Sequence, residues 1–530
     1  MEFNVLREKW IPLSDGHLHS LMETLDNADR LGELASVSRL ENCAIYRLLV
    51  AFCMDALQLK NKDERHAYFA KGRFDQETMA RYVAQCGENS FDLFDKNRPF
   101  MQSRFLAKNQ NKIYKPVADM VMELPSGHTS VFFDHRMENQ HVLSPDEALR
   151  AMLALYMFCA SDGRGYAPSL NGTPCVYTFC LGNNLFETLV LNMLSIRECG
   201  NTDYGKPAWC QDEEESIIKQ VKVDMLQALT WRPRRILLIC RECGDISQIC
   251  LEPGMRFENN DSWHDPNVSY KIVDKNDKGM HSKGIKRSDL PIRPEVGRAL
   301  WRDIDCLAAS GQKQSAIIPA VVSNLPGSRK DVKLLMTGLV TTAGKATKIT
   351  VQHEEINLPA DIPADPTKGG KLHEDMELIE NCGSRLKESI LLRDLIADGN
   401  IDGNKLAFKT KIKMNADQTA AAALLNFFLA MREKMFNSYL PRLSACKQDT
   451  DWINLRLDID QWVEETLRDT LDHDLERIGY SGDNLRKQAL VIDRVMGFFY
   501  TRKKEREGNI NEEYKRSRKK HREDAADKVE

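Results

Sequence analysis

The sequence contains no apolar segment long enough to cross a membrane. Its longest apolar stretches lie near Ala148–Ala160 and Ala420–Met431, and both are shorter than the roughly 20 residues of a membrane-spanning helix. The first ten residues, MEFNVLREKW, lack the apolar core of a signal peptide. The 14 cysteines form no disulfide framework, and thiols of a cytosolic protein stay reduced. We therefore expect a soluble, cytoplasmic protein.

The chain also lacks an excess of positive charge. It has 74 Lys and Arg against 78 Asp and Glu, which gives a formal net charge of -4. Contact with nucleic acid would therefore have to come from a local basic patch or from a partner. The length of 530 residues exceeds a single ordinary core and predicts two or three domains.

Enzyme motifs are missing or defective. Gly338–Lys345 resembles a phosphate-binding loop, but it has one residue too many between its glycines, and Ala346 replaces the metal-binding hydroxyl. Asp398–Gly403 begins like a calcium loop, but Lys409 stands where a bidentate Glu is required. G-x-S-x-G and H-E-x-x-H do not occur, and the 12 histidines do not cluster. We expect no catalytic residues and no enzymatic activity.

One pair of cysteines has the spacing of a metal site. Cys240 and Cys243 form a C-x-x-C followed by Gly244, and such a turn can direct both sulfurs at one zinc ion. Cys250 lies nearby, but no second C-x-x-C follows it. A structural zinc ion and two free thiols on a turn are the two interpretations, and no other cofactor is expected.

The first 350 or so residues mix helical and strand patterns, which predicts an α+β fold with long irregular loops. The second of three predicted helices has two start signals. The Ser144 side chain can cap it, and Pro145 suits its first position. The predicted helices are Glu41–Leu57, Pro145–Cys159 and Leu185–Ile196, and the predicted strands are Ile236–Cys240 and Ser269–Val273.

After Leu358–Gly370 the pattern becomes entirely helical. That stretch contains three prolines and a Gly pair, which predict a linker. Four apolar stripes with helical spacing follow it and predict an antiparallel four-helix bundle. The stripes begin at Met376, Ala421, Ile459 and Leu485.

The last residues are charged and nearly free of apolar side chains. The run Lys515–Arg522 (KRSRKKHR) is basic. A solvated, disordered tail is the main interpretation, and a nucleic-acid-binding arm is the alternative. The predicted organisation is an α+β domain at 1–357, a linker at 358–370, a four-helix bundle at 371–505 and a charged tail at 506–530.

Seven motifs occur in an order that resembles one known family. The opening Phe3–Pro12 contains N-V-L-R-E-K-W-I-P, and Arg98–Gln102 is R-P-F-M-Q. The remaining motifs are Val131–His135, Gly172–Pro174 with Thr178 and Phe179, Leu189–Leu194, Leu229–Pro233 and the C-x-x-C-G turn. Together they resemble the CasA family, the large subunit of the type I-E CRISPR Cascade complex, over nearly the whole chain.

The resemblance implies a non-catalytic subunit with a role in antiviral defence. Such a subunit binds at the foot of Cascade, beside the 5′ end of the guide RNA. It recognises the protospacer-adjacent motif (PAM) in duplex DNA, starts strand separation and recruits a helicase-nuclease. Base pairing with the guide reads most of the sequence, so the protein reads only a short flank. The implied partners are other Cascade subunits, the guide RNA, double-stranded target DNA and the helicase-nuclease.

The resemblance also assigns two sites that contact the flanking duplex, one of them through its minor groove. One is a glycine loop, which suits a groove only about 6 Å wide because its backbone can approach closely. Arg256, just before Phe257, is the second, and it would contact a minor-groove acceptor or a phosphate. The glycine loop consists of Gly163, Arg164, Gly165 and Tyr166.

Two further loops carry implied contacts. Apolar and β-branched segments at Leu335–Thr341 and Thr347–Val351 predict a hairpin. The tip of this hairpin, implied to wedge into the duplex, is Thr342, Ala343, Gly344 and Lys345. The loop implied to contact the guide RNA and a neighbouring subunit is Phe132, Phe133, Asp134 and His135.

Ordinary interpretations exist for the same residues. The glycine loop can be a plain turn after the preceding helix, Arg256 a surface charge, and Phe132 and Phe133 buried core residues. Two other functions also stay open. One is a nucleic-acid-processing enzyme with an unrecognised site, and the other is a helical interaction protein without DNA contact.

Overall fold

The computed structural model describes residues 2–109, 113–124, 141–161, 165–211, 219–220, 222–258, 263–272, 289–308, 318, 330–341, 348–393, 396 and 417–526. The chain divides into two compact units. Unit 1 comprises Met1–Leu307 and Gln312–Ala360, and unit 2 comprises Ala308–Gly311 and Asp361–Glu530. Among the described residues, no helix is both long enough and apolar enough to span a membrane.

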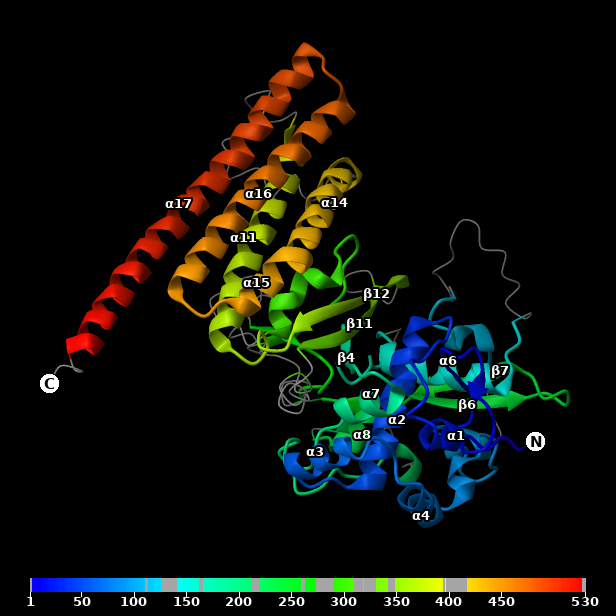
Figure 1. Ribbon diagram of the computed structural model, residues 1–530. Coiled ribbons are helices and arrows are strands. Elements are labelled where there is room, and N and C mark those ends of the chain that lie inside the picture. Colours follow the sequence, from blue (N-terminus) through cyan, green and yellow to red (C-terminus); the bar gives the residue numbers. More distant parts are fainter. Residues whose placement is uncertain are drawn as a thin grey trace. The chain divides into compact units, whose positions relative to one another are not determined.

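The helix α2 (Arg39–Leu57) forms the centre of unit 1 (Figure 1). It begins where the Ser38 side chain accepts a hydrogen bond from the backbone N–H of Glu41. Every residue from Asn42 to Met54 is buried, as expected for a helix that is apolar on nearly all sides. It contacts α4 (Gln76–Cys86), α6 (Pro145–Phe158), α7 (Leu185–Leu191) and α8 (Met225–Leu229).

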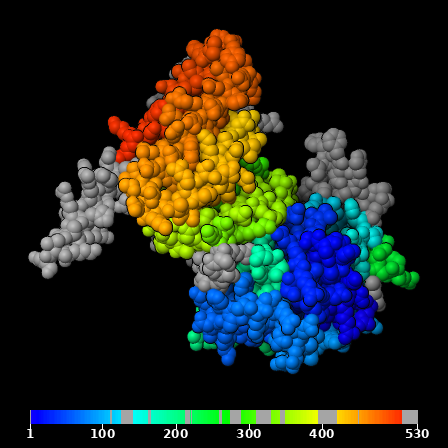
Figure 2. Space-filling model, in the orientation of Figure 1, coloured from blue at the N-terminus to red at the C-terminus, as the bar shows by residue number. Residues whose placement is uncertain are grey.

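Shorter helices complete the helical part of unit 1. The space-filling view shows the N-terminal segments, in blue, on the surface of this unit (Figure 2). The α-helices are α1 (Leu21–Asp26), α3 (Lys62–Ala70) and α5 (Arg104–Lys108). The 3-10 helices are η1 (Glu88–Phe91), η2 (Val117–Met120), η3 (Ala208–Cys210) and η4 (Leu300–Leu307).

A first three-stranded sheet has the order β12-β11-β4. Its central strand β11 (Asp331–Thr341) pairs antiparallel with β12 (Lys348–Pro359) and with β4 (Tyr177–Leu181). β11 is buried along most of its length, which explains why its sequence is a nearly continuous apolar run. The pairing of β11 with β12 confirms the predicted hairpin strands.

A second three-stranded sheet has the order β3-β7-β6. The strands β3 (Tyr114–Pro116), β7 (Ile246–Pro253) and β6 (Arg234–Cys240) are antiparallel neighbours. α5 packs on this sheet through a cluster of Leu106, Leu237 and Cys250. Three two-stranded pairings are β1 (Ile11–Pro12) with β2 (Leu18–His19), β9 (Tyr270–Ile272) with β10 (Asp289–Pro291), and β5 (Lys219–Gln220) with β8 (Arg256–Phe257).

The described part of unit 2 contains four long helices that pack side by side (Figure 1). Between the second and third lie a π-helix, η5 (Met435–Tyr439), and α15 (Leu440–Ala445). Apolar residues recur at helical spacing on the inner faces of the four long helices. Examples on the third of them are Ile459, Val463 and Leu467, which are fully buried. The four helices are α11 (Pro366–Leu391), α14 (Asp417–Lys434), α16 (Asp449–Ile478) and α17 (Gly482–Ala526).

Ion pairs between these helices show an antiparallel order. Near the start of α11, Asp375 pairs with Arg506, far along α17. Just past the end of α11, Arg393 pairs with Asp474, near the end of α16. α11 therefore runs parallel to α16 and antiparallel to α17, as in an up-down-up-down bundle.

Most predicted elements are confirmed, but two boundaries differ by several residues. α7 ends at Leu191 rather than at Ile196, because the Asn192 amide bonds the backbone N–H and C=O of Cys180 on β4. Residues 366–370 belong to a helix rather than to a linker. Pro366 takes the first helical position, where its missing N–H is harmless, and Asp365 caps the helix.

Residues 506–526, predicted as part of a disordered tail, are helical instead. α17 continues as a helix to Ala526. Its sequence contains no Pro and, after Gly508, no Gly, and it is rich in Glu, Lys and Arg, which are strong helix formers. Opposite charges four residues apart, such as Glu512 and Arg516, add support to such a helix.

Candidate nucleic-acid interface

The predicted glycine loop follows α6 in unit 1, and the structure describes its second half. Gly163 and Arg164 lie outside the described residues. Gly165 has φ +93°, a conformation that side chains with a Cβ rarely adopt. Residues 160–167 therefore contain a position where glycine is needed for backbone geometry alone.

Arg234 holds both sides of this loop. Its guanidinium donates to the Ala160 carbonyl at 2.8 Å and to the Ala167 carbonyl, on either side of the glycines. The side chain comes from the first residue of β6, and the residue is only 3% exposed. Hydrogen bonds from a buried charged donor are stronger than neutral ones, so Arg234 fixes the two ends of the loop against the sheet.

Tyr166 is a second attachment between the loop and the β3-β7-β6 sheet. Its hydroxyl donates to the Leu251 carbonyl on β7 at 3.2 Å. The guanidinium of Arg234 lies 5.1 Å from the centre of its ring, and the Lys115 ammonium on β3 lies 5.4 Å from it. Both distances suit cation–π attraction. The ring is therefore held by residues of all three strands.

Arg256 lies in β8 with an exposed side chain. The backbone around it is held firmly. Phe257 packs edge-on against Trp231, with ring centres 6.2 Å apart, and Met255 N–H donates to the Arg232 carbonyl at 2.9 Å. Gly254 permits this turn, because an added Cβ there would lie 2.6 Å from the Arg232 carbonyl oxygen. The chain thus presents an exposed charged group on a fixed backbone.

The glycine loop and Arg256 lie near the same end of β7. A Cβ built on Gly165 would lie 3.6 Å from Cγ of Pro253, the last residue of β7. Arg256 follows Pro253 by three residues, which span at most about 11 Å. The fold therefore places Gly165 and Arg256 near the same end of β7, and the resemblance assigned both to contacts with the flanking duplex.

The other two predicted loops lie outside the described residues. These comprise the hairpin tip Thr342, Ala343, Gly344 and Lys345, and the loop Phe132, Phe133, Asp134 and His135. The structure describes only the strands that carry the tip. Their pairing becomes irregular between Val340 and Thr341, immediately before it.

Cys240 and Cys243 lie at the end of β6 and in the following turn. The Cys243 thiol lies 3.6 Å from a carboxylate oxygen of Asp245, and the Cys240 thiol donates to the Arg241 carbonyl at 3.3 Å. Burial raises the pKa of Cys240, which keeps it a thiol at neutral pH without a metal. Within the described ranges, no group of three or more His, Cys, Asp or Glu could hold a metal ion. The zinc site stays a prediction.

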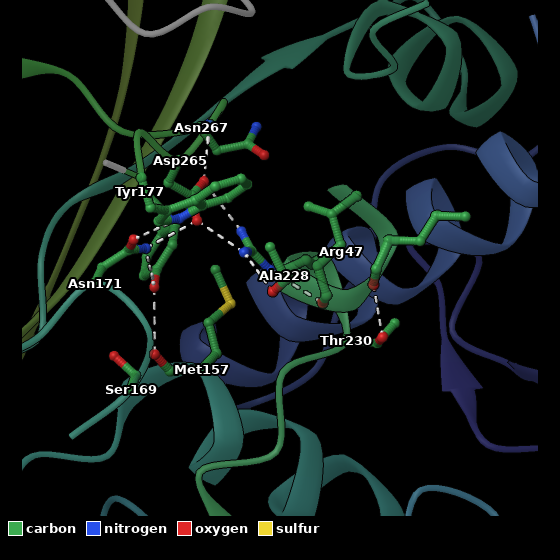
Figure 3. Close-up of polar contacts among 12 residues, drawn as sticks. Arg47, Met157, Ser169, Asn171, Tyr177, Ala228, Thr230, Asp265 and Asn267 are labelled. Atoms are coloured by element: carbon green, nitrogen blue, oxygen red, sulfur yellow. Dashed lines mark hydrogen bonds and ion pairs between the residues drawn. The ribbon is translucent and has the colours of Figure 1, made fainter. Parts of the chain in front are cut away.

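An ion pair in the interior of unit 1 lies beside a small cavity (Figure 3). Arg47 on α2 binds Asp265 through two hydrogen bonds of 2.7 and 3.1 Å, and both residues are buried. Asn171 also donates to Asp265 at 2.8 Å, and Arg47 lies 5.7 Å from the Tyr177 ring centre. The cavity measures about 30 Å³, which is room for about two water molecules. The two charges are therefore paired in the interior, beside a cavity with room for water only.

Two residues that hold the glycine loop, Arg234 and Lys115, were not predicted from the sequence. Arg234 belongs to the basic run Arg232–Arg235 directly before a predicted strand, and that position was the available signal. Lys115 had no signal, because β3 is short and lies far from Tyr166 in the sequence. Their roles depend on the pairing of β3 and β6 with β7.

The comparisons with known proteins define the class. A family model described as CRISPR-associated protein Cse1 matches residues 4–473. The fold and this match define a CRISPR-associated protein, and the chain belongs to the Cse1 family, for which CasA is another name. A comparison with curated proteins found no match.

Solved structures share the fold over nearly the whole chain. CasA of Thermus thermophilus has a TM-score of 0.72 at 18% identity, over 94% of this chain and 100% of that one. Cse1 of Thermobifida fusca has a TM-score of 0.71 at 18% identity, over 95% and 98%. A chain of a CRISPR RNA-guided surveillance complex has a TM-score of 0.72 at 17% identity, over 94% and 99%.

Proposed function

We propose that this chain is the non-catalytic large subunit of a CRISPR RNA-guided surveillance complex and that it recognises the PAM in duplex DNA. Membership in the Cse1 family supports this, as does the fold shared with a chain of such a complex. The observation that carries the proposal is that Gly165 and Arg256 both lie near the same end of β7.

The geometry suits a reader of the minor groove. A groove about 6 Å wide admits backbone and slender side chains only, and Gly163 and Gly165 carry no side chain. Arg234 and Tyr166 hold the loop before DNA arrives, so little ordering entropy is lost on binding. Arg256, beside the loop, supplies a positive charge for a groove acceptor or a phosphate.

The remaining steps rest on the family resemblance. The hairpin of β11 and β12 carries the tip 342–345, which would wedge into the duplex beside the motif, with Lys345 adding charge. Opening the duplex there lets the guide RNA begin pairing. The loop 132–135 would contact the guide RNA and a neighbouring subunit. The complete assembly would then recruit a helicase-nuclease, which performs the chemistry that this chain does not.

Reconstitution with and without the chain tests the proposal. The complex and its guide RNA are mixed with two target duplexes that differ only in the PAM, and the Kd of each is measured. With the chain present, we expect the PAM-containing duplex to bind much more tightly. If the complex that lacks the chain discriminates equally well, the proposal is wrong.

Two assays on the purified chain separate the alternative functions. Incubation of duplex DNA with divalent metal ions tests for an unrecognised nuclease, and robust cutting would replace the proposal. A gel shift across a range of salt concentrations tests for DNA contact. Affinity that falls steeply with salt indicates phosphate contacts, whereas no shift at low salt favours a helical interaction protein.

A further inference from the structure

Two cysteines far apart in the sequence lie next to each other on unit 1. Cys86 is the last residue of α4, and Cys210 is the last residue of η3. Their sulfur atoms lie 3.4 Å apart, although 124 positions separate the two residues. Both side chains are partly exposed, whereas Cys43, Cys53 and Cys175 are buried. An oxidant in solution can therefore reach this pair.

The surroundings make Cys86 the more reactive thiol. When Cys210 donates its hydrogen bond to Cys86, it stabilises the Cys86 thiolate and lowers the pKa of Cys86 to about 7. The hydroxyl of Tyr82 and the charge of Arg98 act in the same direction, whereas burial and the charge of Asp55 oppose them. Burial raises the pKa of Cys43 to about 12. At neutral pH, Cys86 is therefore the better nucleophile, because the thiolate is the attacking form.

We propose that Cys86 and Cys210 form a reversible intramolecular disulfide when the protein meets a small-molecule disulfide such as oxidised glutathione. The Cys86 thiolate attacks one glutathione sulfur, forms a mixed disulfide and releases one glutathione thiolate. The deprotonated Cys210 then attacks the Cys86 sulfur and releases the second. Two protein thiols are oxidised, and one oxidised glutathione is reduced to two glutathione molecules.

The second step is favoured by the first. The interaction with Cys86 is the largest of the influences that raise the pKa of Cys210. Once Cys86 is in a mixed disulfide, that thiolate is gone, and Cys210 loses its proton more easily. A disulfide needs the sulfurs about 2.05 Å apart, so they must approach by roughly 1.4 Å. Gly87 follows Cys86, and both cysteines lie at the ends of their helices, so this approach moves helix ends and not helix interiors.

The bond would tie α4 to a segment that is joined to a family motif. Gln211, next to Cys210, accepts a hydrogen bond of 2.7 Å from Arg98, the first residue of R-P-F-M-Q. The bond would also close a long loop in the unfolded chain, which stabilises the folded state. Oxidation should therefore raise the Tm of unit 1. This inference does not depend on the proposed DNA recognition.

The test uses the full chain with Cys240→Ser and Cys243→Ser, which removes the other exposed pair. Samples are equilibrated with reduced and oxidised glutathione at several ratios, and free thiols are alkylated. Non-reducing peptide mass spectrometry then identifies linked cysteines. We expect the loss of two thiols, one Cys86–Cys210 peptide, and a Tm that rises on oxidation and falls back on reduction.

Variants make the outcome decisive. Cys86→Ser and Cys210→Ser should each abolish the linked peptide and the rise in Tm, whereas the matched control Cys199→Ser should keep both. Melting of the reduced variants checks that they fold. The proposal is wrong if both thiols stay fully alkylated under oxidising ratios, if Cys86 stops at the mixed disulfide with glutathione, or if another cysteine is linked instead.

Discussion

Removing the Arg234 side chain tests whether the glycine loop must be held in place. Arg234→Met keeps much of the side-chain volume but takes away the donors to the Ala160 and Ala167 carbonyls. It also removes the cation that lies 5.1 Å from the Tyr166 ring centre. The loop would lose its strongest link to β6, while the sheet itself keeps its backbone pairing.

The size of the effect follows from these contacts. Each buried carbonyl left without a donor costs about 1–3 kcal/mol, and the cation–π contact contributes about 1 kcal/mol. We expect a total loss of about 3 kcal/mol, because water can reach part of the opened loop. Tyr166→Phe removes only the 3.2 Å bond to Leu251 and should cost about 1 kcal/mol.

Two measurements separate loop opening from global unfolding. Urea denaturation gives the free energy of unfolding, and binding of a PAM-containing duplex by the reconstituted complex gives Kd. If the loop opens locally, Arg234→Met should raise Kd by about 100-fold, since about 1.4 kcal/mol corresponds to tenfold. Tyr166→Phe should raise it by about fivefold. A Kd for Arg234→Met within about threefold of wild type, with correct assembly, would refute the need for a held loop.

Three further changes have defined outcomes. Arg256→Ala should weaken DNA binding by about 1–3 kcal/mol, and it should reduce the salt slope by about one if the contact is a phosphate; Arg256→Lys is the matched control. Gly383→Ala should lower the free energy of unfolding of unit 2, measured by urea denaturation, by about 1–3 kcal/mol, because its Cβ would lie 2.4 Å from the Phe428 ring. The control Gly370→Ala lies on the same helix, and its Cβ would have no neighbour within 4 Å. It should raise the free energy of unfolding by up to about 1 kcal/mol. Asp460→Asn should stabilise unit 2 at pH 8 by up to about 3 kcal/mol and have little effect near pH 4, as measured by urea denaturation at both pH values.

The sign of the last prediction follows from the pKa. Burial raises the pKa of Asp460 to about 6, so the folded unit holds this proton more tightly than the unfolded chain does. The stabilisation from the proton is complete below the unfolded pKa and is lost as pH rises through about 6. A benefit of the substitution that did not depend on pH would contradict this. Equal effects of Gly383→Ala and Gly370→Ala would contradict the steric prediction for unit 2. An unchanged salt slope for Arg256→Ala would exclude a phosphate contact.

Apolar periodicity predicted the helices well, because burial of one face or of the whole helix determines that pattern. α2 and α16 illustrate the two cases: α2 is buried almost all round, and α16 carries one stripe of apolar residues. Chain ends and boundaries were harder. Pro366 permits a helix start that a proline-rich segment conceals, and the charged end of α17 is helical although few apolar residues mark it.

The candidate site was only partly predictable. The resemblance identified Gly165 and Arg256, but their proximity depends on how β7 ends beside the loop. The support from Arg234 and Lys115 depends on strand register and strand order, which spacing along the chain does not reveal. Sequence motifs therefore supplied the candidate residues, and long-range pairing determined what holds them.

The most direct measurement is the ratio of Kd values for duplexes with and without the PAM, determined for complexes that carry wild-type chain or Gly165→Val. Valine is strained at φ +93° and adds bulk where the backbone must enter the groove. The proposed function predicts a ratio that collapses towards one while the complex still assembles. A ratio equal to that of wild type would contradict recognition of the PAM by this loop.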